Sequence, residues 1–402
     1  MKILVINAGS SSLKFQLIDA DNEAVLFKGN CERIGTDGSF IGFKNGSGQK
    51  IERKTQMLNH TQAFEAVKNA LVDPEHGAIK ELSEVSAIGH RVVQGGSYFD
   101  KSVLVNNAVI NKIKELASLA PLHNPANLQG IEACTKVFGA KVPQVVVFDT
   151  AFHQTMPEKA YMYALPYKYY EKFGVRKYGF HGTSHRYVTD KMTEIMGKKE
   201  GDLKLITCHI GNGSSISAIK NGKVVDTTMG LTPLGGFMMG TRSGSLDPSV
   251  VTFIAEKEHL TPQEVSDLLN KQSGLLGVSG VSSDDRDVSA AEANGDMRAH
   301  LAHEMLYYQI AKYIGSYYVV LGGCDGIVFT AGLGENQPQL REKVCDYLAC
   351  IGVKLDKAFN AKAMRGVTGT LSAPDSKIRV ELIATDEEMV IARDTKAIVE
   401  TL

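Results

Sequence analysis

The sequence contains no tryptophan, no long hydrophobic run and almost no excess of one charge sign. Its 44 basic and 45 acidic residues leave a net charge of −1, so nothing indicates a bulk electrostatic attraction to nucleic acid or to a membrane surface. No stretch of about 18 apolar residues is present, which argues against a transmembrane helix. The N-terminus enters a predicted strand without signal-peptide organisation. We therefore expect a cytoplasmic protein with no nucleic acid or membrane partner.

Several common sequence motifs are also missing. The six cysteines form no C-x-x-C pair, which favours reduced thiols. The P-loop pattern is absent, and the dinucleotide fingerprint fails because Ile216 and Gln337 stand where a third glycine belongs. Any phosphate would therefore have to be held by hairpin turns or by a glycine turn at a helix N-terminus.

What is present indicates a soluble α/β protein with two domains. The chain has 402 residues, too many for one typical core, and 43% of them are hydrophobic and 22% charged. Short apolar strands alternate with amphipathic helices. We predict strands at 85–93, 144–148, 326–330 and 380–383, and helices at 107–119, 127–138, 338–348 and 387–401. A domain boundary is expected near residue 150.

The most informative feature is a strand, turn and strand that occurs twice. The first copy covers residues 1–18 and the second covers 203–219. Gly9-Ser10-Ser11 aligns with Gly213-Ser214-Ser215, an offset of 204 residues, which is about half of the chain. Each copy alone reads equally well as an ordinary β-hairpin. Together they predict two related lobes, and the turn from Asn7 to Ser12 offers N–H and hydroxyl groups suited to a phosphate chain and its metal.

Other segments carry residues that could bind an anion. The turn 332–336 precedes a predicted helix, whose N-terminal N–H groups favour phosphate, although a plain strand-to-helix turn explains it too. The glycine-rich segment 230–248 presents Arg242, and a buried strand presents Arg91. A guanidinium grips a carboxylate or phosphate at two points, but a surface ion pair is the commoner use.

Histidines and carboxylates allow further hypotheses. The spacing of His181 and His185 could indicate zinc, but no third local ligand is present, so an anion contact is preferred. His300, His303 and Glu304 are expected to cap a buried helical face, and the acidic run 284–287 is expected to be a solvated loop. Asp149 ends a strand, whereas Glu387 begins a helix, where acidic residues are favoured in any case.

The sequence resembles the acetokinase family, which includes the acetate kinases, over essentially its whole length. The motifs that carry the resemblance are INAGSSSLKF (6–15), GHRVVQGG (89–96), APLHNPAN (120–127), VFDTAFH (147–153), YGFHGTSH (178–185), HIGNGSS (209–215), GGFMMGTRSG (235–244) and FTAGLGEN (329–336).

The resemblance implies an actin/hexokinase-type, ribonuclease H-like fold of two similar α/β lobes with a nucleotide cleft between them, usually as a homodimer. The implied N-terminal lobe is 1–150 plus about 385–402, and the C-terminal lobe, 151–384, would bind the nucleotide and form the dimer. The implied reaction is reversible transfer of the ATP γ-phosphoryl group to acetate, giving acetyl phosphate and ADP, with Mg²⁺ as the metal or Mn²⁺ in its place.

The resemblance also assigns roles by position. Catalytic roles fall on Asp149, His181, Arg242 and Arg91, and Arg91 shares the substrate site with the apolar residues Val93, Leu122, Phe180 and Pro233. Metal contacts fall on Asn7 and Glu387. The nucleotide residues are Lys14, Ser10, Ser12, His209, Ile210, Gly211, Asn212, Gly213, Asp284, Asp285, Arg286, Gly332, Leu333, Gly334, Glu335 and Asn336.

Physical chemistry agrees with these assignments. Acetate is already ionised at pH 7, so the difficulty is to bring two anions together rather than to create a nucleophile. Two arginines, a histidine and Mg²⁺ would reduce that repulsion. Asp149 is then expected to position Arg91, His181 or metal-bound water. Two alternatives stay open, a kinase that prefers propionate or butyrate, and a non-catalytic ATP-driven switch of the same fold.

Overall fold

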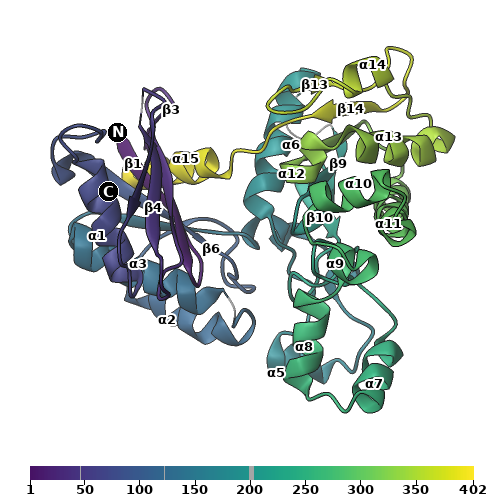
Figure 1. Ribbon diagram of the computed structural model, residues 1–402, viewed down its shortest axis with the longest axis horizontal. Helices are drawn as coiled ribbons and strands as arrows, with labels where there is room; N and C mark the ends of the chain where they lie inside the picture. Colours follow the sequence, from purple (N-terminus) through teal and green to yellow (C-terminus); the bar gives the residue numbers. More distant parts are fainter. Residues whose placement is uncertain (46, 122, 199–202) are drawn as a thin grey trace. The chain divides into compact units, whose positions relative to one another are not determined.

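The computed structural model describes residues 1–45, 47–121, 123–198 and 203–402. The chain divides into two compact units, which we call unit 1 (Met1–Ala151 and Asp386–Leu402) and unit 2 (Phe152–Thr385). It therefore passes into unit 2 after Ala151 and returns to unit 1 after Thr385 (Figure 1). Within the described residues, no helix has the length and apolar character needed to cross a membrane.

Unit 1 is built on an eight-stranded sheet with the order β5-β4-β3-β2-β1-β6-β8-β7. Its strands are β1 (Lys2–Ala8), β2 (Ser12–Asp19), β3 (Ala24–Glu32), β4 (Phe40–Asn45), β5 (Lys50–Lys54), β6 (Val85–Val92), β7 (Val103–Leu104) and β8 (Gln144–Phe148). Its helices are α1 (His60–Leu71), α2 (Asn107–Glu115), α3 (Asn124–Phe138) and α15 (Glu387–Val399), with short 3₁₀ turns at Leu82–Glu84 and Leu116–Ser118.

Alternating side chains of β1 build a core on both faces of this sheet. Leu4 and Ile6 pack with the side chains of α1 and α3, whereas Ile3 and Val5 pack with α15. The C-terminal helix, yellow in Figure 1, thus covers the second face of the sheet in unit 1, far from its neighbours in the sequence. β8 is buried along its whole length, as its nearly pure apolar sequence predicts.

Unit 2 is built on a six-stranded sheet with the order β11-β10-β9-β12-β14-β13. Its strands are β9 (Lys204–Ile210), β10 (Ser214–Lys220), β11 (Lys223–Thr227), β12 (Gly326–Thr330), β13 (Gly369–Thr370) and β14 (Arg379–Leu382). Its helices are α4 (Glu158–Tyr161), α5 (Lys168–Phe173), α6 (Gly182–Met196), α7 (Pro248–Lys257), α8 (Pro262–Lys271), α9 (Gly274–Ser279), α10 (Asp285–Ala293), α11 (Met297–Leu321), α12 (Ala331–Asn336), α13 (Pro338–Tyr347) and α14 (Lys357–Asn360), with 3₁₀ turns at Ala151–Thr155 and Leu348–Ile351.

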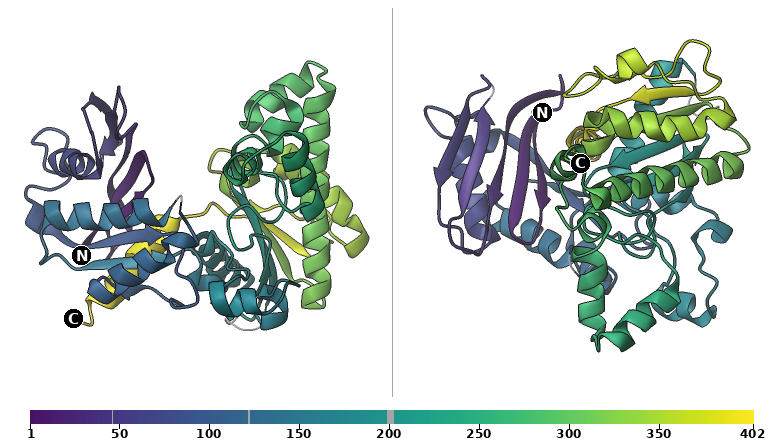
Figure 2. Two further views of the ribbon diagram at one scale, coloured as in Figure 1. Left: turned by 90° about the horizontal axis from the view of Figure 1, so that it is seen from below. Right: turned by 45° about the vertical axis from the view of Figure 1, so that its right-hand side comes forward.

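The sheet of unit 2 is covered by helices in the same way. Ile206 and Cys208 of β9 face the long helix α11, which runs along the sheet in Figure 2, while Leu205 packs with Val188 and Met192 of α6. A single fully buried strand therefore contributes to both cores of the unit.

The two sheets share one topology. The order is β3-β2-β1-β6-β8 in unit 1 and β11-β10-β9-β12-β14 in unit 2. In each order the first three strands are antiparallel, and the last two run parallel to the third strand, β1 or β9. The two hairpins of the sequence repeat, β1–β2 and β9–β10, occupy equivalent places in this order. The protein therefore has two similar α/β lobes.

Two local predictions were wrong, and one correctly predicted helix has a different first residue. The helix predicted at 127–138 begins three residues earlier, at Asn124, because Pro125 is accommodated in the first turn of α3. Residues 332–336 form the short helix α12 rather than a turn. The acidic run at 284–287 begins helix α10 rather than forming a solvated loop, since the carboxylate of Asp284 accepts the N–H of Arg286 and caps that helix.

Candidate functional site

The predicted site residues of unit 1 gather at one edge of its sheet. Asn7, Arg91 and Asp149 lie at or just beyond the carboxyl ends of the parallel strands β1, β6 and β8. The carboxyl ends of parallel strands meet at the same edge, where open α/β sheets bind their ligands. Glu387 reaches this edge as the first residue of α15, which packs across the same three strands.

Arg91 is the centre of this cluster. Its Nε and Nη2 donate to the two carboxylate oxygens of Asp149 at 2.9 and 2.5 Å, and its Nη1 donates to Asn7 Oδ1 at 3.3 Å. Glu387 Oε2 lies 3.8 Å from Arg91 Nε. Asp149 is only 1% exposed, so this two-point contact is buried and fixes the plane of the guanidinium. Asp149 was expected to position Arg91, His181 or metal-bound water, and in unit 1 its partner is Arg91.

Burial and neighbouring charges shift two pKa values in the cluster. Burial opposes the charge of Arg91, but the carboxylates of Asp149 and Glu387 outweigh it and hold the pKa of Arg91 above its usual value. Burial raises the pKa of Glu387 to about 7, against the opposing effect of Arg91 and with further contributions from Asp149 and Glu388. Arg91 is therefore a permanent cation, and Glu387 changes charge near neutral pH.

The turn of the first hairpin is held from behind by side chains of two helices. His60 Nε2, at the start of α1, donates to the carbonyl of Gly9 at 2.7 Å. Asn127 of α3 donates from Nδ2 to the carbonyl of Ala8 at 2.7 Å, and its Oδ1 accepts the N–H of Val93 at 3.1 Å. One amide thus links the hairpin turn to the segment that follows Arg91.

The other predicted residues of unit 1 lie around this turn. Ser10 is exposed and Ser12 partly exposed, so both can reach a ligand, and Lys14 is exposed on β2. Its positive charge is one of the influences that lower the pKa of Glu387. Val93 is buried, at 3% exposure. Leu122 lies outside the described residues.

In unit 2, histidines and serines cluster beside the second hairpin. His181 Nδ1 is hydrogen-bonded to Ser215 Oγ at 2.9 Å, and its ring stacks on that of His209, with centroids 4.1 Å apart. His185 bonds the same serine hydroxyl through Nε2, at 2.7 Å. His181 has a backbone φ of +57°, unusual for a residue other than glycine, and such strain is common at functional positions.

The side chains of Arg242 and His181 lie close to Gly213. A Cβ there would lie 3.2 Å from Arg242 Nη1 and 3.5 Å from His181 Nε2. The two side chains therefore converge on the turn of the second hairpin, as their predicted shared role demands. Burial alone lowers the pKa of Arg242. Its Nη1 donates to the carbonyl of Pro233 at 3.3 Å, so Pro233, predicted to contact the acetate methyl group, lies beside it. Phe180, for which the same contact was predicted, is 1% exposed and directly precedes His181.

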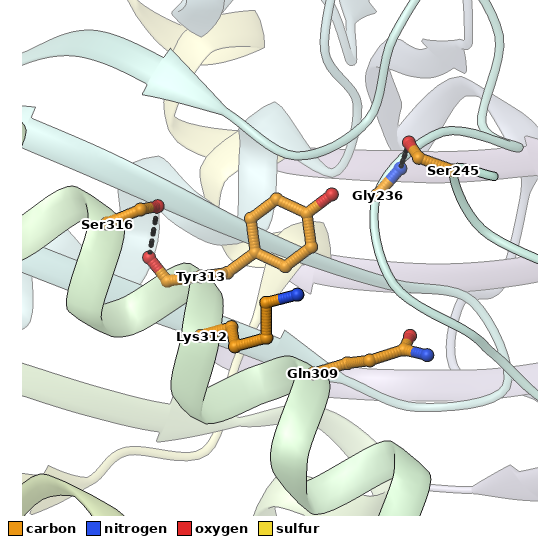
Figure 3. A pocket seen from close by; sticks show the side chains of 6 residues that line it. All are labelled: Gly236, Ser245, Gln309, Lys312, Tyr313 and Ser316. Atoms are coloured by element: carbon orange, nitrogen blue, oxygen red, sulfur yellow. Dashed lines mark hydrogen bonds between the residues drawn. The ribbon is translucent and has the colours of Figure 1, made fainter. Parts of the chain in front are cut away.

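The loop that carries Arg242 is anchored to α11. Gln309 Oε1 accepts the N–H of Met238 at 2.8 Å, and Ser245 Oγ accepts the N–H of Gly236 at 3.0 Å. Figure 3 shows Gln309, Lys312 and Tyr313 of α11 facing this loop across a pocket of about 330 Å³. Gln309 therefore ties the loop to α11, and the bond from Gly236 to Ser245 closes the loop on either side of Arg242.

Helix α12 lies next to the second hairpin. A Cβ on Gly211 would be 3.8 Å from the amide nitrogen of Gly332. Glu335 holds the start of the helix, because its Oε1 accepts the N–H of Ala331 at 2.9 Å and that of Thr385 at 3.2 Å. The buried Arg341 donates to the carbonyl of Gly334 at 2.8 Å. The predicted nucleotide residues 209–213 and 332–336 are thus brought together, although 332–336 is helical.

The two predicted acidic residues of α10 have separate partners. Asp284 pairs with Arg286 at the surface, with Nε at 2.9 Å. Asp285 is buried and accepts from Gln337 Nε2 at 2.7 Å, directly after α12, and it also contacts His303 Nε2 at 3.1 Å. His303 was predicted to cap a helical face, and instead it is buried and joins α11 to α10.

The zinc hypothesis for His181 and His185 finds no support in these contacts, because both rings are hydrogen-bonded to Ser215. In the part of the chain that the structure describes, no group of three or more histidine, cysteine, aspartate or glutamate side chains is placed to hold a metal. The oxygen atoms of Asn7 and Glu387 are the hard donors that Mg²⁺ prefers, and two protein ligands suffice for an ion that keeps water and substrate phosphates.

Sequence reasoning missed several supporting residues. Asn127 and His60 fix the turn of the first hairpin, on which predicted ligands stand. Glu335 was predicted to contact the nucleotide, and in the structure it holds the start of α12. Asn127 is the last residue of the APLHNPAN motif (120–127). Its amide bonds two segments that lie far apart in the chain, and no local sequence pattern reveals such a contact. Only the double asparagine in N-P-A-N at 124–127 could have drawn attention to it.

The chain is similar to known proteins along its whole length. A model of the acetokinase family matches residues 2–393. The chain is 55% identical over 403 residues to an acetate kinase of Thermotoga maritima, with all of both chains covered. A crystal structure of Porphyromonas gingivalis acetate kinase superposes with a TM-score of 0.94 at 49% identity, covering 99% of each chain. A propionate kinase from Francisella tularensis gives 0.92 at 42% identity, covering 98% of this chain and 99% of the other.

Proposed function

Because the chain belongs to the acetokinase family, we propose that it transfers the γ-phosphoryl group of ATP to acetate, reversibly, giving acetyl phosphate and ADP. One observation carries the proposal beyond family membership. Arg242 and His181 converge on the Gly213 turn, where a phosphate held by the hairpin would meet two groups able to neutralise it. The separate cation Arg91 would bind the acetate carboxylate, a second anion for which a protein that only hydrolyses ATP needs no site.

The residues of unit 2 would bind the nucleotide and stabilise the transferring group. The N–H groups of the 209–213 turn and of α12 face one region and can donate to phosphate oxygens. The Arg242 guanidinium and the His181 Nε2 atom would donate to the equatorial oxygens, where charge is spread in the transition state. Ser215 orients the ring of His181 for this task.

The residues of unit 1 would hold acetate and the metal. Arg91 offers a fixed cation to the acetate carboxylate, and Asp149 keeps its guanidinium in one plane. Asp149 in this proposal is a positioning residue and abstracts no proton, since acetate is already ionised. Asn7 and Glu387 would hold Mg²⁺, or Mn²⁺ in its place, which when bound neutralises the β- and γ-phosphates.

The test is to trap the product with hydroxylamine. Purified protein with ATP, Mg²⁺ and acetate should form acetohydroxamate, and omission of any one should abolish the signal. Acetate-independent ATP hydrolysis without hydroxamate would contradict the proposal and favour a nucleotide-driven switch.

A second candidate is preference for propionate or butyrate. The similarity to a propionate kinase favours considering it. The apolar residues Val93, Phe180 and Pro233 would contact the methyl group, and one extra methylene is worth only about 1–3 kcal/mol in such a pocket. Comparison of kcat/KM for the three acids decides the preference, and we expect the highest value for acetate.

We further propose that the protein is a cytoplasmic homodimer, associating through unit 2. Several large apolar side chains of that unit are exposed, including Tyr167 and Phe173 around α5 and Leu246, Val250 and Phe253 around α7. The proposed co-substrate ATP is an intracellular molecule, which supports the location. Light scattering should give twice the 43.6 kDa chain mass. Phe253→Glu should shift it toward the monomer, and an unchanged mass would place the interface elsewhere.

A further inference from the structure

A hollow of about 360 Å³ lies on the outer sheet face of β3, β4 and β5 in unit 1. The helix on this side of the sheet, α15, packs with Ile3, Val5 and Ile18 from β1 and β2, and so covers a different part of the face. The volume falls in the range of small-molecule sites, about 300–1,000 Å³. The hollow is shallow and open to solvent, so any ligand would be held mainly by charge and hydrogen bonds at its walls.

Three lysines form one wall of the hollow. Lys28 of β3 stands directly opposite Lys44 of β4, which stands directly opposite Lys50 of β5. Adjacent strands are about 4.8 Å apart, so the three side chains start within about 10 Å of one another. All three are exposed, and none forms an ion pair with a carboxylate in the described part of the chain. Like charges placed directly opposite each other destabilise a sheet. Lysines at the edge strand β5 also oppose pairing with another chain, and their alignment across three strands gathers their charge on one wall of the hollow.

The opposite wall has a different character. The next cross-strand row is Asn30, Gly42 and Glu52. Gly42 has no side chain, so the space between Asn30 and Glu52 at the bottom of the hollow stays unfilled. A Cβ on Gly42 would lie 3.5 Å from Asn30 Oδ1. Asn30 donates from Nδ2 to Glu32 at 2.7 Å, which orients its Oδ1 toward the floor. This wall therefore offers acceptor oxygens, and Glu52 adds a negative charge.

We propose that this hollow binds a small phosphorylated metabolite that carries hydroxyl or amino groups at the end away from its phosphate. The lysine row holds the phosphate, because the ammonium group is a point-charge phosphate ligand. Asn30 and Glu52 accept hydrogen bonds from the donors at the far end. Lys14 pairs with Asn30 across β2 and β3, so the hollow begins one strand away from that predicted nucleotide residue.

The experiment measures binding to the full chain by calorimetry, with ribose 5-phosphate, pyrophosphate and ribose as probes. Ribose 5-phosphate should bind saturably and more weakly as salt is raised from about 50 to 200 mM, and ribose should not bind. Lys44→Gln, in the centre of the row, should weaken binding at least tenfold. The matched control is Lys54→Gln, which removes the same charge from the neighbouring strand β5 outside the hollow and should leave binding unchanged.

Two further readouts separate this site from the catalytic one and from a purely structural effect. The KM values for ATP and acetate should be the same in wild type, Lys44→Gln and Lys54→Gln. Ligand-free Lys44→Gln should melt at a higher temperature than wild type, since repulsion is relieved. Glu52→Gln should weaken ribose 5-phosphate but not pyrophosphate. Absence of saturable binding to wild type, or equal binding by Lys44→Gln, would overturn the proposal, and equal ribose 5-phosphate binding by Glu52→Gln would overturn its acceptor half.

Discussion

The two units share one strand topology, but the arginines of their predicted sites have different partners. In unit 1 the arginine of the site is paired with Asp149 and lies near Glu387. In unit 2 Arg242 contacts a backbone carbonyl and forms no ion pair within the described residues. A carboxylate-rich edge suits a metal and a fixed orientation, whereas an unpaired cation has its full charge left for phosphate. The two arginines therefore differ in their partners although the two sheets share one strand order.

The largest expected effect is the loss of the unpaired cation. Arg242→Ala should lower kcat by at least about 10²-fold, comparable with removing one charge-stabilising donor, and Arg242→Lys should recover only part of it. Steady-state kinetics of hydroxamate formation measures this, with circular dichroism as the control for folding. A wild-type kcat in Arg242→Ala would contradict the difference inferred between the two arginines, because Arg242 would then have no catalytic role.

Asp149→Asn tests whether the contact with Asp149 is what positions Arg91 in unit 1. Loss of the two-point contact should release Arg91 and lower kcat by about 10²-fold, as displacements of about 1 Å do. Because Asp149 contacts Arg91 directly, raised Mg²⁺ should not restore activity. Rescue at high Mg²⁺ would instead assign Asp149 to the metal. Asp149→Glu serves as the charge-conserving control.

Buried histidines of the two units should respond to pH in opposite directions. Burial lowers the pKa of His90 in β6 to about 4, against the opposing hydrogen bond from Gln144. Its contribution to stability is therefore complete above about pH 6.5 and is lost as the pH falls toward 4, by about 2 kcal/mol at pH 5. In unit 2, burial opposes the charge of His303, but hydrogen bonds and charges from Asp285 and Glu292 raise its pKa, so its contribution is lost as the pH rises through the folded value.

Denaturant unfolding of the wild type, His90→Asn and His303→Asn between pH 4.5 and 8 measures these contributions. His90→Asn should flatten the profile on the acid side, and His303→Asn on the alkaline side. Parallel profiles for all three proteins would show that neither histidine titrates differently on folding.

The smallest effect compares the turns of the two hairpins. Gly213→Ala places its Cβ 3.2 Å from Arg242 Nη1, so this predicted phosphate ligand has to shift, and kcat should fall about tenfold. Gly9→Ala places its Cβ 3.1 Å from the hydroxyl of Ser12, a group that can rotate away, and should change kcat less than about threefold. Equal losses would mean that the two turns have equally rigid surroundings.

Much of the architecture followed from local patterns. The repeated hairpins and the nearly pure apolar strand at 144–148 are strong signals, because buried parallel strands must be apolar on both faces. The resemblance to the acetokinase family is confirmed by the family match. The assignment of individual site residues stays a prediction that the mutations above test. The acidic run at 284–287 was misread because its charges are used for capping and for a contact with Gln337, a residue far away in the chain.

The amino-acid sequence by itself determined the strands, the duplicated hairpins and the kinds of side chain that could bind a phosphate. These features depend on periodicity and composition over short windows. Only the tertiary structure decided that Asp149 fixes Arg91, that Arg242 stays without a carboxylate partner and that three lysines stand in one row. Those outcomes depend on which strands become neighbours and in what register, and pairings between distant segments leave no local trace.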